Sequence, residues 1–306
     1  MVKPAPMSKL RLLASIVKQR VFQKIRKINY GIYGYYKRVE DVDISPLFVL
    51  GSNRSGTSLI SSLLAQHHQL EGIFGKSNTP KLKIDNHILA YCTSHHVWDF
   101  FNPLGNWGQK DEGALWGHPK HISRYYRDKP IDKQESLLLA NLLRSYMKTE
   151  KTPLVNSHFN MLKIGLIAKV FPNAKFVLII RDYQDYIRSC SQKWTKQDID
   201  IEFPKIGLHW LTLNSCCIYD LKKYAPENFT ILDYSTLFHD HKTVNNMLNE
   251  KLKTIGLEEF DYDLGIVNAK HRYLGEEHIT YLQYEDFFGC IDPLLSFERI
   301  LTDDSP

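Results

Sequence analysis

Residues 47–60 read LFVLGSNRSGTSLI, and this stretch decides the fold prediction. An apolar run, typical of a buried strand, meets a loop with two glycines, Gly51 and Gly56, and helix-forming sequence follows. A turn of this kind offers backbone N–H groups and a helix N-terminus to an anion. The usual phosphate loop has a lysine after its second glycine, but here Thr57 stands there and Arg54 comes earlier. The stretch therefore predicts a phosphate-binding loop without the lysine and Mg²⁺ chemistry of nucleoside triphosphate enzymes, or else a helix-capping turn without a ligand.

The rest of the chain alternates short apolar runs with helical patterns. This alternation predicts an α/β fold, in which a central parallel sheet lies between two layers of helices, as in P-loop nucleotide-binding proteins. Ligands of such sheets bind at the carboxyl ends of the strands. The sequence indicates strands at 46–51, 152–157, 174–181 and 229–234, and helices at 57–67, 134–148, 161–171, 183–194, 208–225 and 241–255.

The second half of the chain holds another candidate anion site. Arg181 ends the most apolar strand, and Ser189 follows eight residues later in a helical segment. In a helix that starts near Asp182, Asp182, Tyr186 and Ser189 share one face. Arg181 and the Ser189 hydroxyl are then able to hold one phosphate from two sides, although a strand-end arginine also serves as a salt-bridge partner.

These two segments, SNRSGTSLI (52–60) and FVLIIRDYQDYIRSCSQKW (176–194), resemble the PAPS-dependent sulfotransferases. The donor of that family is 3′-phosphoadenosine 5′-phosphosulfate (PAPS). NFTILDYSTLF (228–238) is similar to a later strand of the family. The resemblance implies a P-loop-like sulfotransferase fold, transfer of a sulfuryl group to an acceptor hydroxyl, and no metal requirement.

The resemblance also implies roles for single residues. The 5′-phosphosulfate loop corresponds to Asn53, Arg54, Ser55, Gly56, Thr57 and Ser58, with Arg54 stabilising charge at the departing oxygen. The 3′-phosphate site corresponds to Arg181 and Ser189. A late basic loop, AKHRYLGEE (269–277), offers Lys270 and Arg272 as a cover for the 3′-phosphate, although it also fits an ordinary basic surface loop.

The general base departs from the family pattern. Many members carry a glutamate shortly after the first helix, where this chain reads FGKSNTP (74–80). The segment VNSHFN (155–160) instead resembles a "K-T-H" segment of cytosolic sulfotransferases, with Asn156 in place of the lysine. We therefore predict His158 as the base, because an imidazole near neutral pKa is able to accept the acceptor's proton. The alternative is that His158 only caps the helix beginning near Asn160.

The composition and the N-terminal segment limit which ligands, surfaces and compartments the sequence suits. A net charge of +5 suits an anionic ligand or membrane surface and does not require nucleic acid. Five scattered cysteines and the lack of a long apolar run predict a reduced, cytoplasmic protein without a membrane span. Residues 1–40 are predicted to form a basic amphipathic helix and an aromatic segment, which either pack on the domain or contact a membrane peripherally. The histidines lack partners at metal-ligand spacing, so we expect no metal site.

Residues 41–306 are predicted to form one domain, whose irregular stretch 72–130 supplies the acceptor loops. This stretch is rich in aromatic rings, which suit a carbohydrate, a glycolipid or a small metabolite, or a small satellite core. Two other functions stay open. A P-loop kinase or NTPase is compatible with Asp233 at a strand end, and a degenerate, non-catalytic sulfotransferase-like binding protein is compatible with Asn156.

Overall fold

The architecture centres on one parallel sheet. A computed structural model describes residues 44–73, 115–122, 136, 140, 143, 144, 147, 149–195 and 201–267. Within them, five strands pair in the order β2-β3-β1-β4-β5. The strands are β1 (Leu47–Leu50), β2 (Leu70–Ile73), β3 (Thr152–Asn156), β4 (Lys175–Ile180) and β5 (Phe229–Asp233).

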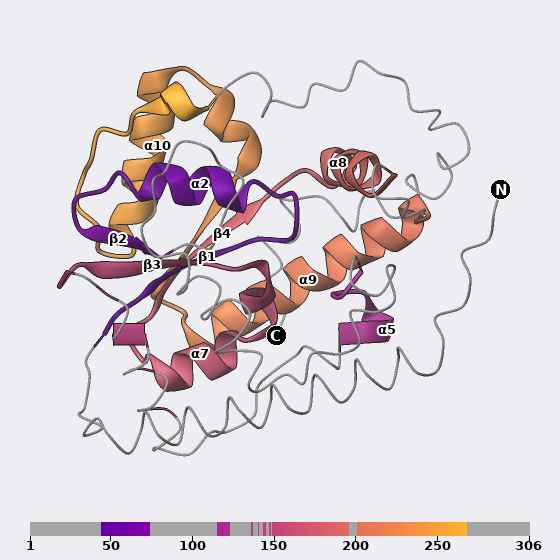
Figure 1. The fold of residues 1–306 in the computed structure, drawn as a ribbon, viewed down its shortest axis with the longest axis horizontal. Coiled ribbons are helices and arrows are strands. Elements are labelled where there is room, and N and C mark those ends of the chain that lie inside the picture. The colour runs from indigo at the N-terminus through magenta and orange to yellow at the C-terminus, as the bar shows by residue number, and fades with distance from the viewer. Residues whose placement is uncertain are drawn as a thin grey trace, which may run out of the picture.

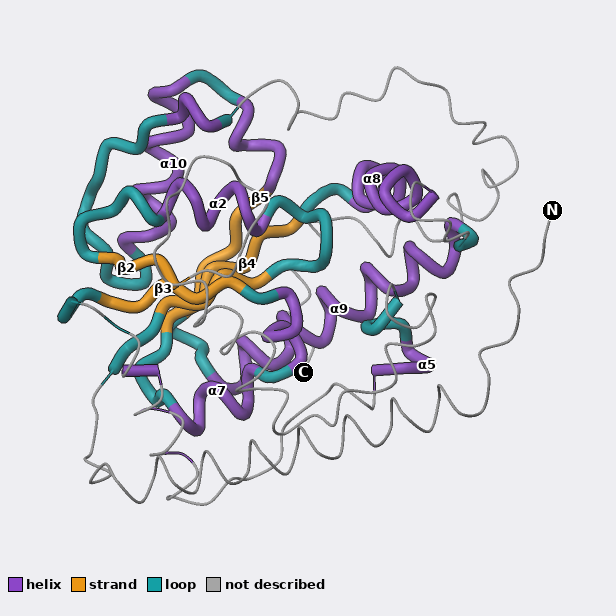
Figure 2. Tube along the Cα trace, viewed as in Figure 1, coloured by secondary structure: helices purple, strands orange, loops and turns teal. Residues whose placement is uncertain are grey.

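The helices form a layer on each face of this sheet. In Figure 1, α2 (Thr57–Leu64) and α10 (His241–Lys253) lie on one side, and α7 (Ile164–Val170) and α9 (Phe203–Tyr224) lie on the other. Figure 2 shows the strands enclosed between these layers. The predicted three-layer α/β fold with a central parallel sheet is confirmed. The remaining helical elements are α5 (Pro119–Ile122), α8 (Tyr183–Thr195) and the short 3₁₀ helices η2 (His158–Leu162), η3 (Tyr234–Phe238) and η4 (Leu264–Ile266).

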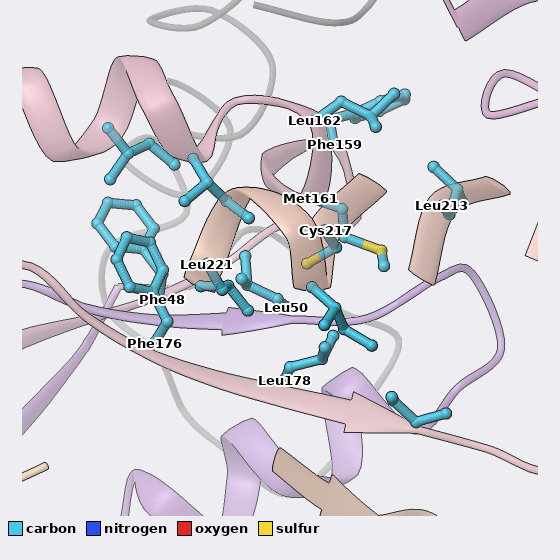
Figure 3. Packing of buried hydrophobic residues seen from close by; sticks show 14 of the residues in the cluster. Phe48, Leu50, Phe159, Met161, Leu162, Phe176, Leu178, Leu213, Cys217 and Leu221 are labelled. Atoms are coloured by element: carbon cyan, nitrogen blue, oxygen red, sulfur yellow. The ribbon is translucent and has the colours of Figure 1, made fainter. Parts of the chain in front are cut away.

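Alternate residues of the central strands face the two layers. Phe48 and Leu178 join the core under α7 and α9, whereas Val49 and Val177 join the core under α2 and α10. Figure 3 shows the first of these cores, where Phe48 stacks on Phe176 with ring centroids 5.7 Å apart. Because both faces are covered, β1 is apolar along its whole length and β4 is apolar after its first residue, Lys175, as is typical of parallel sheets.

Several predicted boundaries are wrong. Edge strand β2, which pairs only with β3, was not predicted. Helix α9 begins at Phe203 rather than at 208, with Pro204 in its first turn, where a missing N–H costs nothing. The segment predicted as one helix over 161–171 contains the end of η2 and then α7, because Lys163 between them has a non-helical backbone (φ −133°, ψ 16°).

Some predicted regions lie outside the described residues. They are the N-terminal segment 1–40, most of the helix 134–148, and the stretch 72–130 apart from 72–73 and 115–122. Across the described ranges, no helix is long and apolar enough to cross a bilayer.

Candidate active site

The site follows from the point where the connections of the sheet change direction. β1 and β4 are neighbours, but α2 leaves β1 over one face while α8 follows β4 in the core of the other face. In parallel sheets such a switch point opens a crevice at the carboxyl ends of the two strands. The loop 51–56 and the strand end at Arg181 therefore meet there.

The loop 51–56 is a tight turn held by its own polar groups. The buried hydroxyls of Ser52 and Ser55 are 2.5 Å apart, and the Ser55 N–H donates to the Ser52 carbonyl oxygen at 3.1 Å. Arg54 has a left-handed backbone (φ 71°), and so has Gly56 (φ 92°), which precedes the first residue of α2. The first N–H groups of α2, at Thr57 and Ser58, have no acceptor within the helix and so favour an anion.

Only glycine fits at position 56. A Cβ atom there would lie 2.3 Å from the ring of Tyr234, which follows β5. The close approach places the loop directly against Tyr234. The same ring lies under the guanidinium of Arg181, whose central carbon is 4.7 Å from the ring centroid. Tyr234 therefore contacts both candidate anion-binding elements.

The structure joins the two predicted phosphate motifs. Arg54 Nε donates to Ser189 Oγ at 3.1 Å, and Arg181 Nη1 donates to the Arg54 carbonyl oxygen at 3.1 Å. Trp210 on α9 in turn donates its indole N–H to the Arg181 carbonyl oxygen at 3.0 Å. Arg181 is 5% exposed, and its Nε has no hydrogen-bond partner among the described residues. A buried guanidinium nitrogen without a partner is costly, which distinguishes Arg181 from an ordinary core residue.

The loop rests on two buried side chains of α8. Cys190 Sγ lies 4.0 Å from the Asn53 carbonyl oxygen, and burial raises the pKa of this thiol to about 12. Burial also raises the pKa of Tyr186, whose hydroxyl lies beside Ser52 and Cys190. Both groups therefore stay protonated and neutral at physiological pH. The charges near this junction include Arg54, Arg181 and the carboxyl of Asp185, which interacts electrostatically with Arg181.

His158 lies at the same edge of the sheet. It is the first residue of η2, directly after β3 and Ser157, and β3 pairs with β1. Its half-buried ring packs against Trp116 and Phe159, with centroids 5.6 and 4.1 Å away. Ser157, rather than His158, occupies the cap position of η2. The predicted residues Lys270 and Arg272 lie outside the described part of the chain.

Some residues of the junction were not predicted. Tyr234 and Trp210 carry no signal in the sequence beyond an aromatic ring at a buried position. Asp233, on which the kinase alternative depends, accepts the Ser235 N–H at 2.8 Å and so caps η3. Among the described residues, no group of three histidine, cysteine or acidic side chains is arranged to hold a metal ion.

Comparison with known proteins agrees with this architecture. The chain aligns with the crystal structure of a sulfotransferase from Alicyclobacillus acidocaldarius at a TM-score of 0.51 and 14% identity, over 82% of this chain and 93% of that one. A sulfotransferase from Mycobacterium tuberculosis H37Rv aligns at 0.46 and 16%, over 76% of each chain. A sulfotransferase domain from the curacin biosynthetic pathway aligns at 0.41 and 15%, over 69% of this chain and 74% of that one.

Comparison of the sequence with protein-family models identifies the family of the chain. No curated protein sequence matches the chain. The model of the sulfotransferase family matches residues 46–252, a span that runs from β1 through most of α10 and includes both candidate anion-binding segments. The chain therefore belongs to the sulfotransferase family.

Proposed function

We propose that this protein transfers the sulfuryl group of PAPS to a hydroxyl of an acceptor molecule. The observation that carries the proposal is the junction of Arg54, Ser189 and Arg181, which joins the loop before the N-terminus of α2 to a second cationic site. PAPS needs two such sites, because it has a phosphosulfate at one end and a 3′-phosphate at the other.

The residues at the junction fit this donor. The buried Nε of Arg181 and the hydroxyl of Ser189 suit the 3′-phosphate, since charge-assisted hydrogen bonds to an anion satisfy a buried guanidinium. The first N–H groups of α2, at Thr57 and Ser58, and the hydroxyls of the same two residues suit the 5′-phosphosulfate. A loop without the P-loop lysine is consistent with a donor that has no γ-phosphate.

The proposed chemistry is a direct transfer with His158 as the base. The acceptor oxygen forms a bond to sulfur as the bond between sulfur and the 5′-phosphate oxygen breaks. His158 takes the acceptor's proton, and 3′-phosphoadenosine 5′-phosphate (PAP) leaves with the electron pair of the broken bond. Arg54 and the N-terminus of α2 stabilise the negative charge that grows on the departing oxygen, which is the largest contribution in related transfers.

For the acceptor we propose a carbohydrate or glycolipid, or a small metabolite with a hydroxyl. The proposal depends on the aromatic composition of 72–130, because flat rings suit sugar faces and lipid surfaces. The basic helix predicted in residues 1–40 supports a cytoplasmic protein with peripheral contact to an anionic membrane. Neither proposal requires a metal or nucleic acid.

Calorimetry of the full chain with PAP, with ATP and Mg²⁺ as the comparison, tests the donor. We expect PAP to bind and Arg181→Ala to weaken binding by at least about a hundredfold, because a buried charged hydrogen bond is lost. Arg144→Ala, at an exposed arginine 3.8 Å from Glu150, should bind as the wild type does. Binding of ATP with Mg²⁺ and not of PAP would overturn the proposal in favour of a kinase, and binding of neither would leave the loop without a donor role.

A further inference from the structure

Helix α9 carries a fully buried histidine, His209, that the proposed transfer does not use. Its Nδ1 accepts the backbone N–H of Gly117 at 3.1 Å. Since Nδ1 is the acceptor, the neutral ring carries its hydrogen on Nε2, and the orientation of the imidazole is fixed. His209 thereby ties the segment 115–118 to α9.

The next turn of α9 secures the same segment. Leu213 lies four residues after His209 and so on the same face of the helix. A Cβ atom on Gly117 would lie 2.3 Å from the Leu213 side chain. The hydrogen bond and this close packing hold Gly117 at one place on α9, and the adjacent Trp116 is 1% exposed.

Trp116 connects His209 to His158. The rings of Trp116 and His209 meet edge to face at 5.8 Å and 82°, and Trp116 also contacts the ring of His158 at 5.6 Å. Phe159 closes the group, 4.9 Å from Trp116. The ring of His158 is therefore packed on a tryptophan whose own place depends on His209.

His209 also contacts a residue that supports the phosphate loop. Its ring stacks on Tyr186 at 6.4 Å and 25°. The hydroxyl of Tyr186 lies beside Ser52 and Cys190 beneath the loop. The imidazole of His209 thus contacts both Tyr186, which lies beneath the loop, and Trp116, which packs on His158.

We infer that His209 is a positioning residue for the transfer reaction. It holds Trp116 through Gly117, and Trp116 holds the ring of His158 towards the acceptor. The inference rests on the proposed function for the role of His158, but the placement of His158 is measurable without turnover. Misplacing a reacting group by about 1 Å costs on the order of a hundredfold in rate, whereas donor binding by Arg181 should change little.

Two amide substitutions of His209 distinguish the effect of its hydrogen bond to Gly117 from the effect of losing the imidazole ring. In His209→Asn, the side-chain oxygen lies near the place of Nδ1 and is able to accept the Gly117 N–H. In His209→Gln, the amide reaches the place of Nε2 and leaves that N–H unpaired. His67→Gln is the control, because His67 is also buried and its Nδ1 also accepts a backbone N–H, from Gln69, but it lies under the other face of the sheet.

The first readout is the NMR resonance of the His158 ring in the full chain, assigned with His158→Gln. The tryptophan ring current makes this resonance sensitive to the distance from Trp116. We expect it to shift in His209→Gln, to return near the wild-type value in His209→Asn, and to stay unchanged in His67→Gln. An unchanged resonance in folded His209→Gln, or an equal shift in His67→Gln, would overturn the inference.

The second readout is the release of sulfate from PAPS with water as the acceptor, together with PAP affinity. We expect His209→Gln to lower the maximal rate by about ten- to a hundredfold at unchanged PAP affinity, with most of the loss restored in His209→Asn. Equal losses in both amides would mean that His209 only stabilises the fold. If the wild-type chain does not bind PAP, the proposed function fails, while the NMR comparison still decides whether His209 places His158.

Discussion

Arg54 Nε and Ser189 Oγ lie 3.1 Å apart, although 135 positions separate the two residues in the sequence. The bond connects the loop after β1 with the helix after β4. The bond also orients the guanidinium of Arg54. Since Arg54 is exposed, the guanidinium nitrogens other than Nε are placed to contact a ligand. The two candidate anion-binding segments therefore form one structural unit.

Replacing Ser189 should weaken donor binding moderately. Ser189→Ala removes one hydroxyl from the proposed 3′-phosphate site and the acceptor of the Arg54 hydrogen bond, so we expect PAP affinity to fall by about tenfold. Calorimetry measures the change. Thr212→Ala is a suitable control, because that hydroxyl bonds only its own helix, at Leu208. Unchanged affinity in Ser189→Ala would place the 3′-phosphate elsewhere.

Two glycines with left-handed backbones should respond differently to alanine. Gly56→Ala places a Cβ atom 2.3 Å from Tyr234, whereas Gly256→Ala meets only the flexible end of Lys175 at 3.3 Å. Both substitutions incur backbone strain of about 1–2 kcal/mol. We expect Gly56→Ala to lower the free energy of unfolding by about 1–3 kcal/mol more than Gly256→Ala does, because of the contact with Tyr234. We also expect it to abolish PAP binding, because Tyr234 also supports Arg181.

Chemical denaturation and PAP calorimetry on both glycine variants test this prediction. Gly256→Ala should bind PAP like the wild type. Equal destabilisation of the two variants would show that backbone strain, and not the contact with Tyr234, dominates at position 56.

His158 should matter for turnover and not for donor affinity. His158→Gln keeps a polar side chain of similar size but removes the proton acceptor, so we expect the rate of sulfuryl transfer to fall by about a hundredfold to ten thousandfold. PAP affinity should stay within about twofold, because His158 is not part of the Arg54, Ser189 and Arg181 junction. Single-turnover assays with labelled PAPS measure the rate, and full activity in His158→Gln would assign the base to another residue.

The buried His67 predicts a pH dependence of stability. Its Nε2 donates to the Glu258 carbonyl oxygen at 2.9 Å while Nδ1 accepts from Gln69, and burial lowers the pKa of His67 below its ordinary value. The unfolded chain therefore takes up a proton at higher pH than the folded one. The stability contributed by neutral His67 is complete above about pH 6.5 and is lost as the pH falls towards the folded-state pKa.

Urea denaturation of the wild type and His67→Gln from about pH 7.5 to about pH 5 tests this sign. The difference in free energy of unfolding between them should shrink as the solution becomes more acidic. The neighbouring pair of His68 and Glu258, 3.1 Å apart, is present in both proteins and should cancel in the comparison. A difference that grows towards acidic pH would contradict the assignment.

Cys190 should resist alkylation while the protein is folded. Since burial raises the pKa of its thiol to about 12, the reactive thiolate is scarce at neutral pH. We expect native Cys190 to react with iodoacetamide on the order of a thousandfold more slowly than in the unfolded chain, and after the half-buried Cys216. Mass spectrometry of the labelled peptides gives both rates, and rapid labelling of native Cys190 would show that the loop above it opens.

The sequence predicted the strands of the sheet core well, and the reasons are local. β1, β4 and β5 are nearly continuous apolar runs followed by polar residues, so their ends were placed within about two residues. β2 was missed because LEGI (70–73) is short, contains Glu71 and Gly72, and gains its strand character only by pairing with β3. Such an edge strand is specified by its neighbour rather than by its own composition.

The candidate site was predicted as segments but not as an arrangement. The motifs around Gly56 and Arg181 stand out because glycine and a strand-end arginine are conspicuous in sequence. No local pattern predicts that the side chain of Arg54 reaches Ser189, because this contact depends on the left-handed turn at Arg54 and on the order of β1 and β4 in the sheet. No sequence pattern assigned a role to Tyr234 or His209, and only their contacts distinguish them from other buried residues.

The central place of β1 also has a consequence for biosynthesis. Leu47 pairs with Leu154 on one side and with Lys175 on the other. During synthesis β1 therefore stays unpaired until β3 and β4 have left the ribosome. Pairings over such distances form slowly, and an unpaired apolar strand is prone to aggregate. The loop at 51–56 is thus expected to be among the last parts to reach its final conformation, and a nascent chain that is interrupted before β4 exposes the apolar segment LFVL without its second partner strand.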